Sequence, residues 1–217
     1  WTTEIDQLKE PFFTTSLTVT NHHPFDVPES FKFKQGDDYQ HKYYESMHYS
    51  DAMLGEFLEK IQTKAWYQNT LVIVTADTSN YQLPQKPFKD TEDFVRVRTQ
   101  IPLIILGGAI KEPMVIDEYA SQIDLAPTIM DLITDKLTSH WAGSSLLNKN
   151  YPGLAFTNRP GNYWAVMSKN GRFYQNGGKD YYVDFKNKND ELKYKRLGSA
   201  WIKANKWLLQ ENLIWKD

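Results

Sequence analysis

The chain has 217 residues, of which 41% are apolar and 24% charged, and its 25 basic and 27 acidic side chains give a net charge of −2. This size and balance predict a soluble globular domain or a large piece of one, with no polybasic footprint for nucleic acid or anionic lipid. No apolar run reaches the roughly 18 residues of a membrane-spanning helix, and the absence of cysteine excludes disulfides, thiolate metal sites and cysteine nucleophiles.

The first expected element is a strand over residues 13–19. Apolar and polar side chains alternate there, and β-branched residues are frequent. The strand runs into a loop at Asn21-His22-His23-Pro24, because proline cannot donate to a strand ladder.

A long amphipathic helix is expected next, from about Asp38 to Trp66, because apolar side chains recur there every three or four residues. Two short apolar runs follow, residues 71–74 and 101–106, and both are typical of strands buried in a largely parallel sheet. The connection Thr78–Gln100 is long and irregular, and such loops are more often functional than idle. This order of elements predicts an α/β fold.

A further helix is expected to begin near Asp124. With Asp124 at the N-cap, Pro127 falls in the first turn, where its missing N–H has no intrahelical partner anyway.

The last part of the chain predicts a small antiparallel unit. Residues 163–175 flank an Asn170-Gly171 pair, which is a strong hairpin signal. Gly177-Gly178 precedes another strand at 181–185, and a closing amphipathic helix is expected from about Glu191 to Glu211.

Asp77 is the first candidate for chemistry, because it directly follows an apolar strand. Ligands of open α/β sheets bind outside the carboxyl ends of the strands, so a carboxylate there is placed to hold a hard cation or a substrate amine. The alternative is structural, since an aspartate after a strand often caps the turn through its own side chain. Position alone favours neither interpretation.

His22 and His23 are the second candidate. An imidazole at a strand end can bind an oxyanion or a metal, although a lone loop histidine is more often a surface group. Two consecutive side chains point in roughly opposite directions, so we expect at most one to face a site.

Other polar residues are assigned to structure. His41 and His48 lie two full helical turns apart, too far to share an ion, and His140 is expected in a loop. Ser144 and Ser145 have no base nearby in the sequence, and there is no glycine-rich phosphate loop or nucleophile elbow. We therefore expect this chain to supply no catalytic nucleophile.

Five stretches match one family in order and spacing. They are FFTTSLTVTNHHPFDVPE, HYSDAMLGEFLEKIQTKAWYQNTLVIVTAD, TQIPLIILGG, SQIDLAPTIMDLI and GSSLL. Through them the sequence resembles the carboxyl-terminal half of the sulfatase-like branch of the alkaline phosphatase superfamily, in particular lipoteichoic acid synthases and related phosphoglycerol transferases of bacterial envelopes.

The resemblance implies roles for three residues. In that family a buried strand ends in Asp-His, and both side chains bind a catalytic divalent metal, so Asp77 would be the metal-binding aspartate for manganese, zinc, magnesium or calcium. Thr78 stands at the histidine position, and a neutral hydroxyl is a much poorer ligand than imidazole. The Asn-His-x-Pro pattern makes His22 the residue that contacts the substrate phosphate. The Thr or Ser nucleophile and the remaining ligands would lie upstream of Trp1.

The resemblance also implies the architecture. We expect an alkaline phosphatase-like α/β fold with a mostly parallel sheet flanked by helices, upstream strands missing, and a small C-terminal antiparallel sheet with a closing helix. Residues 1–150 would belong to the sulfatase-like α/β domain and residues 151–217 to the antiparallel subdomain. Because a sheet without its neighbours exposes an edge, we expect pairing with the upstream half of the same polypeptide, or an oligomer. The first residue is Trp1 rather than Met, and no basic segment followed by an apolar signal core is seen, so we expect the chain to begin inside a longer polypeptide.

The implied function is that of the C-terminal part of a metal-dependent phosphoglycerol transferase or sulfatase-like hydrolase. It would act on phosphate or sulfate esters in the bacterial cell envelope and would be inactive alone. The alternative, motivated by Thr78, is a catalytically degenerate member that serves as a binding or assembly module. Either protein would be extracytoplasmic and attached to the membrane through an upstream region, with no nucleic-acid partner.

Overall fold

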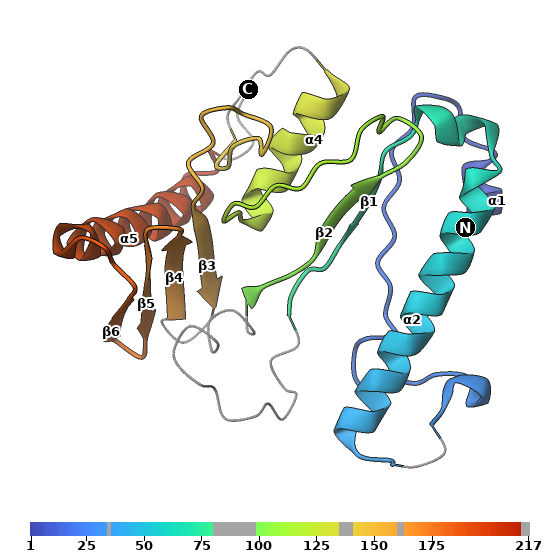
Figure 1. Ribbon diagram of the computed structural model, residues 1–217, viewed down its shortest axis with the longest axis horizontal. Coiled ribbons are helices and arrows are strands. Elements are labelled where there is room, and N and C mark those ends of the chain that lie inside the picture. The colour runs from blue at the N-terminus through green and yellow to red at the C-terminus, as the bar shows by residue number, and fades with distance from the viewer. Residues whose placement is uncertain (34–35, 80–98, 135–140, 160–162, 214–217) are drawn as a thin grey trace. The chain divides into compact units, whose positions relative to one another are not determined.

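Figure 1 shows the computed structural model, which describes residues 1–33, 36–79, 99–134, 141–159 and 163–213. The chain divides into two units, Trp1–Pro113 and Met114–Asp217. The division at residue 150 that the resemblance implies stays a prediction. Most of the expected functional loop, residues 80–98, lies outside the described ranges, and so does His140. None of the helices in this described part combines the length and hydropathy needed to cross a bilayer.

The first unit is built around α2 (Tyr39–Gln62), the long helix expected from the sequence. Asp38 is its N-cap, and the carboxylate accepts hydrogen bonds from two backbone N–H groups of the first turn that have no intrahelical partner. The helix ends before Trp66, which lies in the 3-10 turn η2 (Ala65–Asn69). Among the other helices it contacts η2, α1 (Thr2–Ile5) and η1 (Glu29–Phe31).

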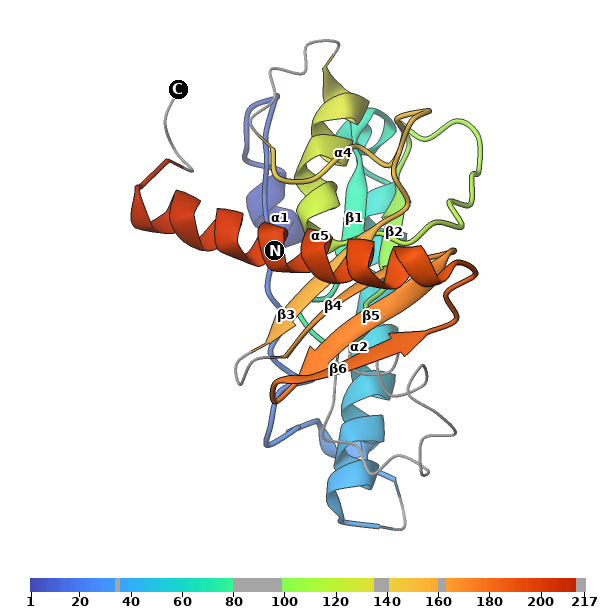
Figure 2. The same ribbon diagram turned by 90° about the vertical axis from the view of Figure 1, so that its left-hand side faces the viewer.

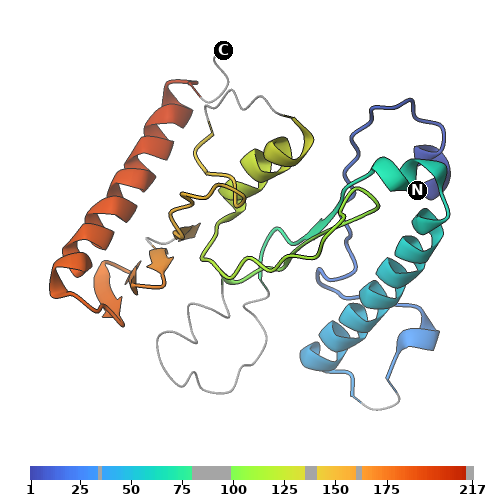
Figure 3. The ribbon, with the colours of Figure 1, turned by 45° about the horizontal axis from the view of Figure 1, so that its top comes forward.

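Residues 13–19 do not form the expected strand, so this prediction was wrong. The segment runs between α2 and β1 (Val72–Thr75) in Figures 1 and 3, but it makes no ladder with any described strand. Phe13, Leu17 and Val19 are 82%, 78% and 72% exposed. Alternation makes a segment suitable for a sheet, but a strand forms only when its backbone groups find a partner.

The two apolar runs form β1 and β2 (Leu103–Leu106), close to the expected positions. They pair antiparallel, with Val72 opposite Leu106, whereas a parallel arrangement was expected. An apolar run carries no information about direction, and antiparallel strands occur at the edges of otherwise parallel α/β sheets. Leu103 and Ile104 are 39% and 52% exposed, so the prediction that β2 is buried on both faces was also wrong.

The second unit begins with the 3-10 turn η3 (Gln122–Asp124) and α4 (Leu125–Ile133). Pro127 lies in the first turn of α4, as expected. The chain then enters an antiparallel sheet with the order β3-β4-β5-β6. The strands are β3 (Ala155–Arg159), β4 (Tyr163–Ser168), β5 (Gly171–Asn176) and β6 (Lys179–Val183).

The hairpin between β4 and β5 is confirmed, with its turn one residue earlier than expected. Gly171 pairs with Ser168, so the two turn residues are Lys169 and Asn170. Between β5 and β6, Gly177 and Gly178 have φ angles of 56° and 82°, which glycine adopts without the steric cost of a side chain. Strand β3 was not predicted from the sequence, because its five residues show no alternation of apolar and polar side chains.

The closing helix α5 (Lys188–Gln210) crosses one face of this sheet, as Figure 2 shows. It starts slightly before the expected Glu191. A Cβ atom at Gly198 would lie 2.2 Å from the Trp164 ring, so only glycine allows the helix this close to β4. The core between helix and sheet consists of Trp164, Val166, Phe173 and Tyr194.

Candidate phosphate and metal site

His22 lies in a loop that contacts α2 both before and after this residue. Before it, the Ser50 hydroxyl donates to the Asn21 side-chain oxygen at 2.7 Å. After it, Phe25 is only 4% exposed and packs edge-on against two tyrosine rings of α2. Phe25 has a φ of 67°, a left-handed conformation that costs a non-glycine residue on the order of 1 kcal/mol. Burial of its ring offsets this cost and fixes the loop.

The His22 imidazole is exposed between these two anchors, and its hydrogen bonding defines its chemistry. Nδ1 lies 2.8 Å from the His23 carbonyl oxygen. Because a carbonyl only accepts, Nδ1 must carry the proton and donate, which leaves Nε2 directed elsewhere. In the neutral ring Nε2 is an acceptor, and in the protonated ring it is a donor. His22 can therefore donate to an oxyanion when the ring is protonated.

Asp77 and Thr78 follow β1 in a bend, and both are exposed. The Thr78 hydroxyl donates to the Ser79 carbonyl oxygen at 3.2 Å. The Asp77 carboxylate makes no turn-capping hydrogen bond or ion pair with a described residue. This leaves its oxygens available to a ligand.

The resemblance implies a divalent cation bound at Asp77, and such a cation needs several ligands. Structural zinc takes four ligands, and magnesium or calcium takes six or more. Within the described ranges, no three histidine, aspartate or glutamate side chains converge on one point. One carboxylate and one hydroxyl that is already donating do not fit a cation by themselves. A metal at Asp77 needs donors from outside the described residues.

Asp124 in the second unit has a different role from the one expected. Its side chain does not cap α4. Instead the carboxylate, in a residue only 4% exposed, accepts hydrogen bonds from the Ser121 N–H at 2.8 Å, the Ser144 N–H at 2.8 Å and the Tyr151 hydroxyl at 2.9 Å. A buried carboxylate is stable only when its lone pairs are satisfied. Asp124 therefore ties the loop after α4 to the start of the helix.

This contact gives Tyr151 a measurable pH dependence. Burial, followed by the hydrogen bond to Asp124, raises the pKa of Tyr151 above its ordinary value of about 10. The resulting stability is fully present below a pH of about 10 and falls as the pH rises above it, because only the unfolded chain then loses the proton. We expect the stability advantage of the parent over Tyr151→Phe to shrink above that pH. Urea titrations at stepped pH measure it, and an unchanged difference would contradict the assignment.

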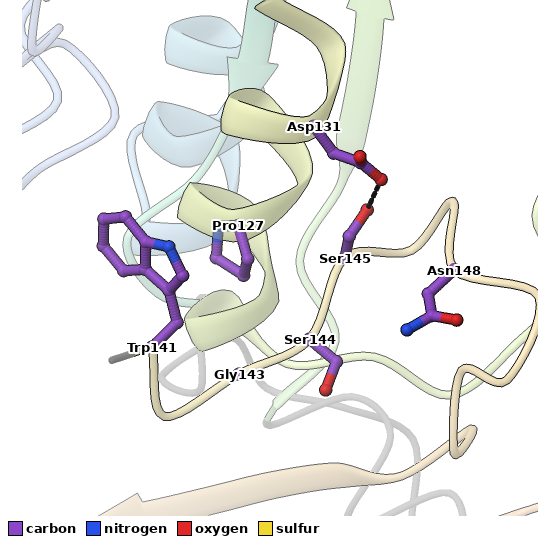
Figure 4. Close-up of a pocket in the computed structure, with 7 residues that line it drawn as sticks. All are labelled: Pro127, Asp131, Trp141, Gly143, Ser144, Ser145 and Asn148. Atoms are coloured by element: carbon purple, nitrogen blue, oxygen red, sulfur yellow. Dashed lines mark hydrogen bonds between the residues drawn. The ribbon is translucent and has the colours of Figure 1, made fainter. Parts of the chain in front are cut away.

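A hollow of about 370 Å³ lies beside this network (Figure 4). The Ser145 hydroxyl donates to the Asp131 carboxylate at 2.6 Å and accepts from the Leu147 N–H at 3.1 Å. Both interactions stabilise the loop, and the described residues of the lining include no imidazole to serve as a base. The lining residues are Pro127, Asp131, Trp141, Gly143, Ser144, Ser145 and Asn148.

The hydrogen-bond network centred on Asp124 was not predicted from the sequence. Its partners Ser144 and Tyr151 lie 20 and 27 residues away, and no local pattern connects them. The Ser121-x-x-Asp124 spacing resembles a capping box and was the one available signal.

Comparison with known proteins gives consistent matches. The chain matches the family model described as Sulfatase over residues 1–135. It is 30% identical over 206 residues to lipoteichoic acid synthase of Staphylococcus aureus (strain USA300), covering 86% of this chain and 29% of that protein. It is 28% identical over 160 residues to lipoteichoic acid synthase 2 of Bacillus subtilis (strain 168), covering 68% of this chain and 24% of that protein. The chain thus spans less than a third of the length of these curated relatives.

Two solved structures share the fold. A protein in the alkaline phosphatase superfamily from Vibrio parahaemolyticus matches with a TM-score of 0.73 and 23% identity, over 94% of this chain and 52% of that one. The lipoteichoic acid synthase LtaP from Listeria monocytogenes matches with a TM-score of 0.68 and 20% identity, over 89% of this chain and 52% of that one. The expected alkaline phosphatase-like fold is confirmed.

Proposed function

The chain belongs to the Sulfatase family, and on that premise we propose that it is the C-terminal part of a metal-dependent phosphoglycerol transferase or sulfatase-like hydrolase. Its substrates would be phosphate or sulfate esters of the bacterial cell envelope. The observation that carries the proposal is the family match over residues 1–135, which includes both His22 and Asp77. The names of the matched relatives favour a phosphoglycerol transferase over a sulfatase.

His22 is assigned to the substrate oxyanion. Its loop is fixed on α2 by Asn21 and Phe25, and Nδ1 is used by the His23 carbonyl, so Nε2 is the atom that meets a ligand. A protonated imidazole donates a charge-assisted hydrogen bond to a phosphate or sulfate oxygen and stabilises negative charge as it develops there.

Asp77 is assigned as one ligand of a divalent cation, manganese, zinc, magnesium or calcium. Its exposed carboxylate has no partner among the described residues, and oxygen ligands suit these hard cations. The other ligands and the nucleophile would come from outside the described residues. By itself the chain would therefore be inactive.

Exposed apolar side chains support this dependence on another part of the polypeptide. Phe13, Leu17 and Val19 are largely exposed on a strand-like segment, and Ile104 on β2 is 52% exposed. Side chains of this kind are covered when a sheet is complete. We assign the cover to the upstream half of the same polypeptide, which would also attach the protein to the membrane on its extracytoplasmic face.

The test is to produce the full-length polypeptide and to assay aryl sulfates, phosphodiesters and phosphatidylglycerol with added metal. We expect turnover by the full-length protein and none by residues 1–217 alone. Replacing the imidazole in His22→Ala is expected to lower kcat by about 100-fold, the loss typical of one oxyanion donor. Turnover that survives His22→Ala unchanged would contradict the assignment of His22, and turnover by residues 1–217 would contradict the dependence on another part.

Thr78 favours a second candidate function. A hydroxyl at the position where the family has a histidine weakens the metal site, which fits a degenerate member that serves as a binding or assembly module. Absence of turnover in the full-length protein, both as it stands and with Thr78→His, would favour this second function.

A further inference from the structure

The outward side of α5 is positively charged, although the chain as a whole has a slightly negative net charge. Between Leu192 and Gln210 the helix has five basic side chains and no acidic one, whereas the chain as a whole has a net charge of −2. The inward side packs on the sheet through Tyr194 and Gly198. The five basic residues are Lys193, Lys195, Arg196, Lys203 and Lys206.

Four of these cations have no ion-pair partner among the described residues. Lys195 forms an ion pair with Asp180 of β6. The other four make no ion pair within the described part of the chain. Asp184, the acidic residue just after β6, is paired with Arg172. The acidic residues of the helix itself lie in its first turn, at Asp190 and Glu191.

Large apolar side chains lie among these cations. Leu192 and Trp207 are 58% and 54% exposed. At 3.6 residues per turn, Leu192, Arg196, Lys203 and Trp207 fall within a sector of about 60° on the helix surface and extend over about 22 Å along its axis. We call these four residues the outer stripe of α5. Lys193 and Lys206 flank it on either side.

We propose that the outer stripe of α5 docks on an anionic lipid surface. Phosphate head groups would meet the unpaired cations, and the Trp207 and Leu192 side chains would enter the boundary between head groups and acyl chains, where indole rings are favoured. Lysine and arginine can bury their aliphatic stems there and keep their charges at the phosphates. A soluble polyanion would use the cations but not the apolar residues between them, so the combination favours a membrane. The proposal does not depend on the enzymatic activity proposed above.

The test uses the full-length polypeptide without its membrane-attaching region, so that the upstream half covers the apolar side chains of residues 13–19 and β2. The vesicles contain equal parts of phosphatidylglycerol and phosphatidylcholine, with pure phosphatidylcholine vesicles for comparison. We expect sedimentation with the anionic vesicles only, weakening as salt is added because the interaction is screened. Each basic residue near an anionic surface contributes about a five-fold factor in partitioning, so Arg196→Gln with Lys203→Gln is expected to lower the partition coefficient about 25-fold. Trp207→Ala is expected to weaken binding as well.

The matched control is the double variant Lys149→Gln with Lys179→Gln, which removes two exposed cations of the same unit that are not part of α5. It is expected to bind like the parent. The proposal is overturned by equal binding to both kinds of vesicle, by no binding to either, or by a control that loses as much as the α5 variant. It is also overturned if inorganic polyphosphate binds the protein and Trp207→Ala has no effect on vesicle binding, since the stripe would then be a polyanion site. Circular dichroism verifies that the variants keep the helix.

Discussion

Asp124→Ala is expected to lower the free energy of unfolding of the second unit by about 4 kcal/mol. The substitution removes the acceptor of three hydrogen bonds, from the N–H groups of Ser121 and Ser144 and from the Tyr151 hydroxyl. The position is 4% exposed, so water does not readily replace the lost partner. The Tyr151 hydroxyl keeps the Tyr119 carbonyl oxygen as an acceptor at 3.0 Å, and each of the two N–H groups left without an acceptor costs about 1–3 kcal/mol. Chemical denaturation measured by circular dichroism gives the difference.

Two controls separate this effect from the loss of any carboxylate. Asp124→Asn keeps one side-chain oxygen and is expected to cost clearly less than Asp124→Ala. Asp117→Ala removes a carboxylate whose side chain is 97% exposed, near Lys169, and is expected to change stability by less than about 0.5 kcal/mol. Equal losses for Asp124→Ala and Asp117→Ala would contradict the role assigned to the buried network.

The second large effect concerns catalysis by the full-length polypeptide. Asp77→Ala is expected to lower kcat/KM by more than about 100-fold, because loss of a metal ligand should exceed the 10- to 100-fold effect of losing one of its outer-shell partners. Thr78→His is expected to act in the opposite direction and to raise activity at limiting metal, since imidazole is a better ligand than a hydroxyl. Steady-state rates over a series of manganese concentrations measure both changes.

Ser79→Ala is the matched control for this pair. It changes a neighbouring side chain and keeps the carbonyl that accepts from Thr78. We expect it to leave kcat/KM close to that of the parent. A loss in Ser79→Ala as large as that in Asp77→Ala would point to damage of the bend after β1, and would contradict a specific role for the Asp77 carboxylate.

The elements that sequence predicted well are those whose determinants are local. The helix α2 has an apolar period of three to four residues and an aspartate at its N-cap, and α5 has the same kind of period. The β4–β5 hairpin follows from a glycine next to its turn. In each case the residues that decide the structure lie within a few positions of one another.

The elements that sequence predicted poorly depend on distant partners. Residues 13–19 have the pattern of a strand but find no described strand to pair with. The direction in which β1 and β2 pair is not encoded in their apolar side chains.

The same distinction holds for the candidate site. The loop at His22 could be located from the Asn-His-x-Pro pattern, but the contact of Asn21 with Ser50, 29 residues away, could not. Asp77 could be identified as a residue after a strand. The described residues contain no group of side chains that would complete a metal site there, and the pattern around Asp77 does not identify further donors.

The assignment of Asp77 as a metal ligand is tested most directly by calorimetry. Manganese is titrated into the full-length polypeptide carrying Thr78→His, alone and together with Asp77→Ala. We expect tight stoichiometric binding by the first protein and its loss in the second. Equally tight binding in the presence of Asp77→Ala, or no binding by either protein, would contradict it.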